Sequence, residues 1–127
     1  MTQAAKALTK SKLTAREWAE ALRSGKYRQA SAELVVSKNK KNSYCCLGVL
    51  CSIGGLNRMD NGFEFDGNKN ESDLSRDTLN YFGLSEKTML HLIDMNDGND
   101  EKGTPKQNFK QIAYFIEKKV KLNGDRK

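Results

Sequence analysis

The stretch Tyr44-Cys45-Cys46-Leu47-Gly48-Val49-Leu50-Cys51 places all three cysteines of the chain within seven residues. Cysteines this close can form a metal site, a redox switch or a catalytic nucleophile. In a helix, which turns by about 100° per residue, Cys45 and Cys46 point a quarter turn apart and Cys51 lies on a third side. In a strand, the two adjacent cysteines would face opposite sides. The stretch is therefore predicted to be a buried apolar segment in which cysteine serves as a small hydrophobic residue.

This segment is predicted to be a central helix that ends at Gly54-Gly55. On a helical wheel, one side consists of the apolar residues Cys46, Val49, Leu50 and Ile53. A second side carries only small residues, namely Cys45, Gly48 and Ser52. We therefore expect another element to pack closely against the side with the small residues.

The residues before this segment predict a helix with a well-defined start. Thr14 is positioned as its N-cap, and Glu17, three residues later, completes a capping box. Leu13 and Trp18 form the hydrophobic staple that often accompanies such a box. Gly25 is a natural stop for this helix.

Short strands and turns are predicted on both sides of the cysteine segment. Residues 32–36 have strand character, and residues 38–42 form a polar turn. Asp60-Asn61-Gly62, followed by alternating residues over 63–67, indicates a hairpin. Residues 67–73 are predicted to be a loop.

Three further helices are predicted in the second half of the chain. Two short helices begin at the N-caps Ser75 and Ser85; Gly83 ends the first, and the second runs to about Asn96. The last helix is predicted to have Thr104 as N-cap, Pro105 at its first position and Gln107 at its third, and to end at Gly124. Its apolar stripe consists of Phe109, Ile112, Ala113, Ile116 and Val120.

These elements together predict an α+β fold. We expect a single, mostly helical domain over residues 13–124, with roughly five helices and a small antiparallel sheet or hairpin. Residues 1–12 lack a clear hydrophobic face and are expected to form a flexible N-terminal segment. A length of 127 residues suits one domain.

Composition favours a soluble protein without a membrane span. Hydrophobic residues make up 37% of the chain, charged residues make up 30%, and the mean hydropathy is −0.75. No apolar run approaches the roughly 18 residues of a membrane helix, and the N-terminus has no apolar region of the secretory type. An odd number of cysteines, two of them adjacent, does not suit a disulfide framework. We therefore expect a cytoplasmic protein in a reducing environment.

Charge is distributed unevenly along the chain, whose net charge is +6. Residues 1–41 contain ten Lys and Arg against three Asp and Glu, whereas residues 42–101 contain four against eleven. Residues 102–127 are again basic, with eight against two. The basic ends can neutralise the acidic middle within the fold, or they can form a basic surface for an acidic partner such as nucleic acid.

Residue types that support metal or catalytic chemistry are present, but their spacing does not fit it. A zinc site from the cysteines and His91 would need cysteine pairs on a polar turn, and residues 47–50 are apolar. A nucleophile at Cys45 or Cys46 would need His91 as its base, yet His91 is predicted to face solvent. In an EF-hand loop starting at Asp94, position 6 would be Asn99 instead of glycine. The sequence therefore predicts no catalytic residue, no metal site and no cofactor.

Two sets of residues are candidates for binding. The first set has polar groups near element ends, where a host protein or a small polar ligand can be recognised: Asn96, Asp97, Arg23, Tyr27, Arg28 and Gln29. The second set places lysines around an aromatic residue on the last helix, as nucleic-acid binding requires: Lys106, Lys110, Tyr114 and Lys121. A non-catalytic binding protein is the preferred interpretation. A nucleic-acid-binding protein and a cysteine-dependent enzyme are the alternatives.

Three pieces of the sequence resemble a family of small, largely uncharacterised proteins of tailed phages and prophages. The pieces are residues 18–29 (Trp-Ala-Glu-Ala-Leu-Arg-Ser-Gly-Lys-Tyr-Arg-Gln), residues 44–51, and Met95-Asn96-Asp97 followed by Phe109, Ile112-Ala113 and Ile116-Glu117. The Tyr-Cys-Cys-Leu-Gly-Val-Leu-Cys run is the most specific of them. The resemblance implies an accessory protein that acts in the cytoplasm of an infected bacterium, where small phage proteins often bind host machinery without catalysis.

Overall fold

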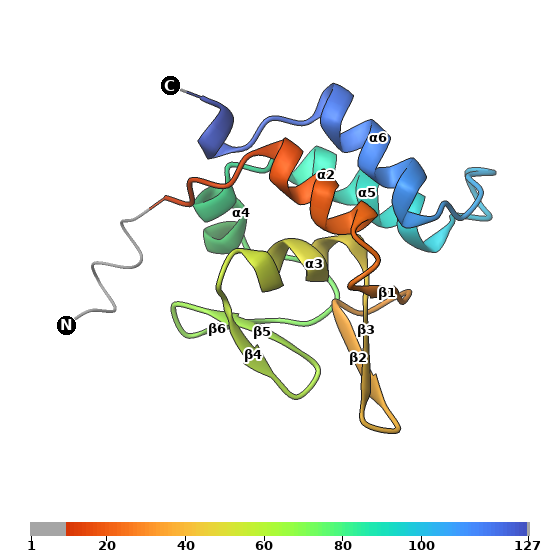
Figure 1. Ribbon diagram of the computed structural model, residues 1–127, viewed down its shortest axis with the longest axis horizontal. Coiled ribbons are helices and arrows are strands. Elements are labelled where there is room, and N and C mark those ends of the chain that lie inside the picture. The colour runs from red at the N-terminus through yellow and green to blue at the C-terminus, as the bar shows by residue number, and fades with distance from the viewer. Residues whose placement is uncertain (1–9, 127) are drawn as a thin grey trace.

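The structure is a computed structural model that describes residues 10–126 and arranges them around the central helix α3 (Cys46–Ile53). In Figure 1 the helices α2 (Ala15–Arg23), α5 (Glu86–Asp97) and α6 (Phe109–Lys119) lie on one side of α3. Two three-stranded sheets lie on its other side, and α4 (Arg76–Phe82) stands at one end. The predicted α+β single domain, mostly helical with small sheets, is confirmed for the described residues.

Helix α3 is the most deeply buried helix, as its sequence predicted. Its residues from Cys46 to Cys51 are all buried. A Cβ atom on Gly48 would lie 1.9 Å from the carbonyl oxygen of Leu34. The same oxygen accepts a hydrogen bond from the backbone N–H of Cys45 at 3.1 Å. The predicted close contact on the small-residue side of this helix is therefore confirmed, and the chain around Leu34 makes it.

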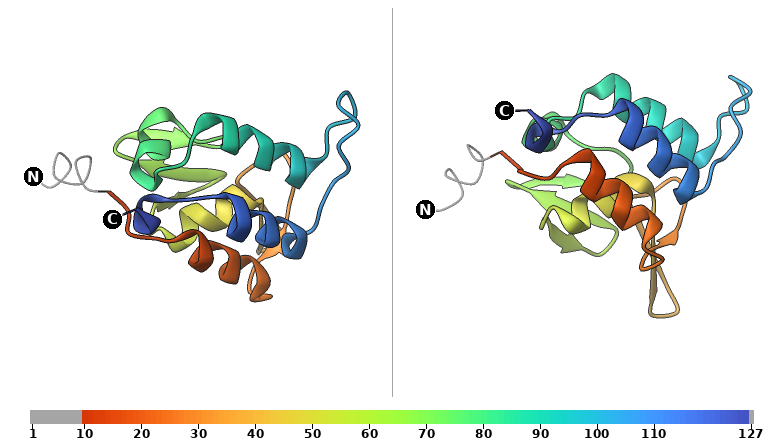
Figure 2. Two further views of the ribbon diagram at one scale, coloured as in Figure 1. Left: turned by 90° about the horizontal axis from the view of Figure 1, so that it is seen from above. Right: turned by 45° about the horizontal axis from the view of Figure 1, so that its top comes forward.

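Helix α2 begins as predicted and is fastened to α3 by a buried hydrogen bond. Thr14 is the N-cap, and both hydrogen bonds of the capping box with Glu17 are present. Trp18 is fully buried, and its indole N–H donates to the carbonyl oxygen of Cys46 at 2.9 Å. α2 also packs along α6, beside which it lies in both views of Figure 2. It therefore joins the central helix to the last helix.

The first sheet contains a hairpin and a parallel strand that the sequence analysis did not predict. Its strands are β1 (Arg28–Gln29), β2 (Val35–Lys38) and β3 (Lys41–Tyr44), in the order β1-β3-β2. β2 and β3 are antiparallel, whereas β1 pairs with β3 in parallel. The strand predicted at residues 32–36 starts instead at Val35, because Ala32 has a left-handed backbone with a φ of 74°. The polar turn predicted at 38–42 is reduced to Asn39 and Lys40.

The second sheet is an antiparallel meander of β4 (Asn57–Met59), β5 (Gly62–Phe65) and β6 (Asn68–Asn70). The hairpin predicted around Asp60-Asn61-Gly62 is confirmed by the pairing of Met59 with Gly62. The loop predicted at 67–73 is wrong at its start, because residues 68–70 form β6. This edge strand is made of polar residues, so it lacks the apolar alternation from which a strand is normally predicted.

The N-caps predicted for the last three helices are right for α4 and α5 and wrong for α6. Ser75 and Ser85 are the N-caps of α4 and α5, and Gly83 ends α4 in a left-handed conformation, as expected. The predicted start of α6 at Thr104 is wrong: Asn108 is its N-cap and forms a capping box with Gln111. Thr104 instead pairs with Asn99 in a β-bridge. None of the helices in the described part of the chain is long and apolar enough to cross a membrane.

The C-terminal segment closes over the start of α2. α6 ends at Lys119 and not at Gly124, which lies in the short 3-10 helix η1 (Asn123–Asp125). The carboxylate of Asp125 accepts a hydrogen bond from the backbone N–H of Ala15 at 2.9 Å, where a negative charge stabilises a helix N-terminus. Most of the segment expected to be flexible, residues 1–9, lies outside the described residues. Ser11 is already part of the fold, because it is buried and its N–H donates to the carbonyl oxygen of Tyr81 at 2.8 Å.

The contact between Gly48 and Leu34 yields a prediction about stability. We expect Gly48→Ala to lower the free energy of unfolding by about 3 kcal/mol, since the added methyl group would force the Leu34 backbone away from α3. Ser52→Ala, on the partly exposed part of the same helix, should change it by less than about 0.5 kcal/mol. Urea unfolding of both variants measures the difference, and equal effects would contradict the close contact.

Candidate functional site

Asn96, a predicted ligand-binding residue, lies at the centre of a buried hydrogen-bond network. Its Nδ2 group donates to the carbonyl oxygen of Ala30 at 2.7 Å and to the carboxylate of Asp97 at 2.8 Å. Its Oδ1 atom accepts from the side chain of Gln29 at 3.1 Å and from the backbone N–H of Cys46 at 3.2 Å. A carboxamide can donate two hydrogen bonds and accept two. All four are made within the protein, so Asn96 has no hydrogen-bonding position left for a ligand.

The network also accounts for the polarity of its neighbours Asp97 and Gln29. The Oδ1 atom of Asp97 accepts from the backbone N–H of Ala32 at 3.1 Å and so holds that residue in its left-handed conformation. Gln29 donates a second time, to the carbonyl oxygen of Gln107 at 2.8 Å. Both Asn96 and Asp97 therefore hold β1 and its following loop against α5, and their polarity serves the fold.

The other three residues of the first candidate set lie apart from this network. Arg23 at the end of α2 forms an ion pair with Glu117 of α6. Tyr27 packs edge-on against Tyr44, with ring centroids 5.2 Å apart, and its hydroxyl lies 3.5 Å from Oγ of Ser52. Arg28 is exposed on β1. The structure thus brings together three of the six predicted residues, and Arg28 lies apart from them on the first sheet.

Arg28 lies on the outer face of the first sheet, where the strand register gathers basic side chains. Arg28 on β1 and Val36 on β2 both pair with Ser43 on β3. Two residues nearer the tip of the hairpin, Lys38 on β2 lies directly opposite Lys41 on β3. Because side chains alternate between the faces of a strand, these five residues share the side opposite to buried Val35. We call this surface the cationic sheet face: Arg28, Val36, Lys38, Lys41 and Ser43.

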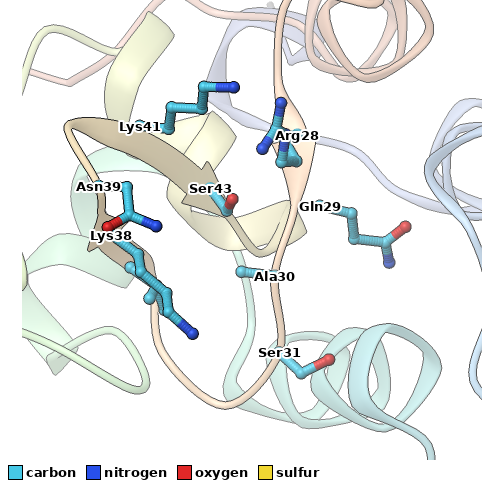
Figure 3. A pocket seen from close by; sticks show the side chains of 9 residues that line it. Arg28, Gln29, Ala30, Ser31, Lys38, Asn39, Lys41 and Ser43 are labelled. Atoms are coloured by element: carbon cyan, nitrogen blue, oxygen red, sulfur yellow. The ribbon is translucent and has the colours of Figure 1, made fainter.

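The cationic sheet face is hollowed and open to solvent. A hollow of about 520 Å³ is lined by its five residues together with Gln29, Ala30, Ser31 and Asn39. In Figure 3 Ser43 lies between Arg28 on β1 and the lysines of the hairpin, whereas the side chain of Gln29 turns the other way. A second hollow of about 510 Å³ shares Arg28 and Lys41 and adds Lys26 and Tyr27. The two hollows form a continuous basic surface along β1.

The electrostatics of this face favour an anionic ligand. No Asp or Glu lines either hollow. The ion pairs of residues 10–126 join other residues, so Arg28, Lys38 and Lys41 have no acidic partner within 4.0 Å there. Two like charges directly opposite each other on neighbouring strands destabilise a sheet. A bound anion would remove this repulsion.

The turn of the β2–β3 hairpin is also less stable than it could be. Asn39 and Lys40 have φ angles of 52° and 63°, the left-handed values that a type I′ turn requires. The β5–β6 hairpin of the same protein makes its turn with Asp66 and Gly67, at 50° and 83°. Glycine adopts this conformation without strain, whereas a side chain such as that of Lys40 costs about 1 kcal/mol. The chain therefore carries a third lysine at a position that favours glycine.

The three cysteines are buried thiols of the core. Burial raises the pKa of Cys45 from 9.0 to about 11. Burial likewise raises the pKa of Cys46 and of Cys51 well above its ordinary value. His91, the predicted base of a cysteine enzyme, is exposed on α5 with its ring 4.9 Å from that of Phe115. The thiols are therefore protonated at neutral pH and shielded from solvent.

The acidic loop after α5 is held by internal hydrogen bonds. Asp94 accepts from the side chain of Asn99 at 3.0 Å and from Lys102 at 3.1 Å. The hydrogen bond from Asn99 is the main cause that lowers the pKa of Asp94, and Lys102 adds to it. Within the described residues, no three His, Cys, Asp or Glu side chains come together as a metal site.

The second candidate set is only partly on α6. Tyr114 is 64% exposed, and the ammonium group of Lys118 lies 5.5 Å from the centre of its ring. Lys110 lies on the first turn of α6, but Lys106 precedes the helix and Lys121 follows it. The prediction that all four residues share one helix is therefore wrong, although all four are exposed.

Lys38, Lys41 and Ser43, which line the first hollow, are not among the residues that the sequence singles out. The sequence predicts a polar turn over residues 38–42, because Asn-Lys is not one of the usual hairpin dipeptides. The pairing of Val36 with Ser43 would reveal that these residues share one face, since Val36 lies two residues before Lys38 and Ser43 lies two residues after Lys41. That pairing follows only if Asn39-Lys40 is recognised as a two-residue turn.

The network at Asn96 predicts a large loss of stability when it is removed. We expect Asn96→Ala to lower the free energy of unfolding by about 3 kcal/mol or more, because it leaves the buried N–H of Cys46 and the carbonyl of Ala30 without their partner. Asn68→Ala removes the same group from an exposed position and should cost less than about 0.5 kcal/mol. Thermal unfolding of both compares them, and a mild effect of Asn96→Ala would mean that the network is loose.

The buried thiols predict a loss of stability at high pH. Their folded-state pKa values lie above the ordinary value of 9.0, so above that pH the unfolded chain loses protons that the folded chain keeps. Each thiol should then lower the free energy of unfolding by about 1.4 kcal/mol per pH unit. Denaturation between about pH 8 and 10.5 measures the slope, and Cys51→Ala should reduce it. Rapid alkylation of a thiol in the folded protein at neutral pH would contradict the burial.

Comparison with known proteins gives a family without a function. A family model described as a domain of unknown function (DUF8296) matches residues 9–79. No curated protein and no solved structure matches the chain. The matched residues make up more than half of the chain and include α2, α3, both sheets and therefore the cationic sheet face. This chain belongs to the DUF8296 family.

Proposed function

We propose that this protein is a non-catalytic binding protein that holds an anionic partner on its cationic sheet face. The observation that carries the proposal is the set of three basic side chains, Arg28, Lys38 and Lys41, gathered on one sheet face with no acidic partner within 4.0 Å among residues 10–126. Phosphate groups are the ligands that such a cluster of Arg and Lys side chains fits best. The resemblance to small phage proteins supports the further proposal that the partner belongs to an infected bacterial host and is met in its cytoplasm.

Rigid support favours binding at this face. β1 is held by the hydrogen bonds of Gln29 and Ala30 to Asn96, so the position of Arg28 is set by the core of the protein. β3 leads directly into α3, whose first residue is held by the same Asn96. A site on supported strands keeps its geometry when the ligand arrives, which lowers the entropic cost of binding.

A second candidate function is nucleic-acid binding around α6. The large exposure of Tyr114, with Lys118 next to its ring, favours it, because an exposed aromatic side chain can stack on a base. Lys106, Lys110 and Lys121 would then contact the phosphates.

Two variants with the same change in charge separate these two functions. Lys38→Gln/Lys41→Gln removes two charges from the cationic sheet face, and Lys110→Gln/Lys121→Gln removes two from the region of α6. With immobilised inorganic polyphosphate at about 50 mM salt, we expect the first variant to bind about tenfold more weakly and the second to bind as the parent protein does. Biolayer interferometry gives the affinities.

The other results of this comparison would overturn the proposal. Equal losses in the two variants would mean that net charge alone attracts the polyanion. A loss of polyphosphate affinity confined to Lys110→Gln/Lys121→Gln would place the site at α6. Weaker binding of a single-stranded oligonucleotide by the variant Tyr114→Ala would support that location.

A further inference from the structure

The β2–β3 hairpin extends from the body of the protein as an arm, away from the helices (Figure 1; Figure 2, right). Residues 37–42 are all exposed and include three lysines but no acidic residue. Only the base of the hairpin takes part in the core, through Val35, which is fully buried. The side-chain hydrogen bond that joins the outer half of the hairpin to the second sheet, from Arg58 to Oδ1 of Asn42 at 3.3 Å, does not involve the three lysines.

The position of Lys40 at the tip points to a role outside the fold. Lys40 occupies a left-handed position that glycine fills without strain, and Lys38 and Lys41 repel each other across the strands. Strain of this kind is retained where the side chain contributes to binding. Three positive charges at the end of a projecting ribbon are arranged to meet an anionic surface that surrounds the ribbon.

We propose that the β2–β3 hairpin enters the major groove of B-form duplex DNA. This inference rests on the proposed function and names its partner. The major groove is about 12 Å wide and 8.5 Å deep and admits a two-stranded β-ribbon. Beyond the pair Val36–Ser43 each strand continues for about 10 Å to the tip, at roughly 3.3 Å per residue. The arm is therefore long enough to reach the edges of the bases.

The side chains of the arm divide into two roles. Asn39 and Lys40 at the tip reach the base edges, where Asn pairs with adenine and Lys with guanine. Lys38, Lys41 and Arg28 lie further from the tip, on the cationic sheet face, and contact the phosphates along the side of the groove that this face meets. Duplex RNA does not offer this fit, because its major groove is too narrow for side chains to read. An acidic protein surface offers charge but no groove.

Fluorescence anisotropy with a labelled 20-base-pair DNA duplex, measured over a series of salt concentrations, tests the inference. Contacts of Arg28, Lys38 and Lys41 with three phosphates predict a slope of about −2.7 in log K against log salt. Lys38→Gln should make that slope shallower by about one. Lys87→Gln, with the same loss of charge on the exposed side of α5 and outside both candidate sets, should leave the affinity within about twofold of the parent.

Lys40→Gly is the sharpest variant, because it should change binding and stability in opposite directions. The substitution gives the turn an Asn-Gly dipeptide, which is the preferred one for a type I′ hairpin. The melting temperature should therefore rise by about 3 °C, while affinity for the DNA duplex falls at least about fivefold. A loss of binding together with a gain in stability cannot be ascribed to unfolding. Unchanged DNA affinity in Lys40→Gly would overturn the role of the tip.

Three comparison ligands separate failure of this inference from failure of the proposed function. Equal affinities for duplex DNA, duplex RNA of the same length and poly-glutamate would overturn groove binding and leave a general anion-binding face. Binding of inorganic polyphosphate without binding of duplex DNA would have the same meaning. Failure to bind any of the four would overturn both proposals.

Discussion

The carboxamide of Asn96 determines how four segments of this protein fit together. Helix α3 begins at Cys46 without a side-chain cap of its own, and Asn96 supplies that cap from α5. The same group holds Gln29 of β1 and Ala30, the residue that follows the strand. A fully buried amide tolerates few alternatives, because any lost hydrogen bond leaves a polar group in the core. The first sheet and its basic face are therefore positioned by a single side chain far from them in sequence.

The three pieces of sequence at residues 18–29, 44–51 and 95–117 are joined by side-chain contacts near this amide. Trp18 from the first piece donates to the carbonyl oxygen of Cys46 in the second, and Gln29 donates to Asn96 in the third. Arg23 and Glu117 join the first and the third at the surface. The distinctive motifs thus describe contacts that assemble the core. The cysteines belong to this assembly as small apolar residues, which is why their spacing fits no chemical site.

The sequence predicted those structural features, such as helix caps, that depend only on residues close together in the chain. The capping box of Thr14 and Glu17, the N-caps Ser75 and Ser85 and the small side of α3 were all found, because each depends on residues within one or two turns. Strands β1 and β6 were missed, since two or three polar residues carry no periodic pattern. The burial of Asn96 was missed because its partners lie 50 to 67 residues away. The basic face depends on strand register, which no helix signal reveals.

The pairing of α2 with α6 has a consequence for how the chain behaves during synthesis. Arg23 and Glu117 are 94 residues apart, so a ribosome adding about 5 to 20 residues per second needs roughly 5 to 20 seconds to supply the partner of α2. Until then, the side of α2 that packs along α6 in the finished fold has no partner, although Trp18 can already meet Cys46 of α3, 28 residues after it. The nascent chain therefore presents a hydrophobic segment of the kind that chaperones bind, and it does so for most of its translation.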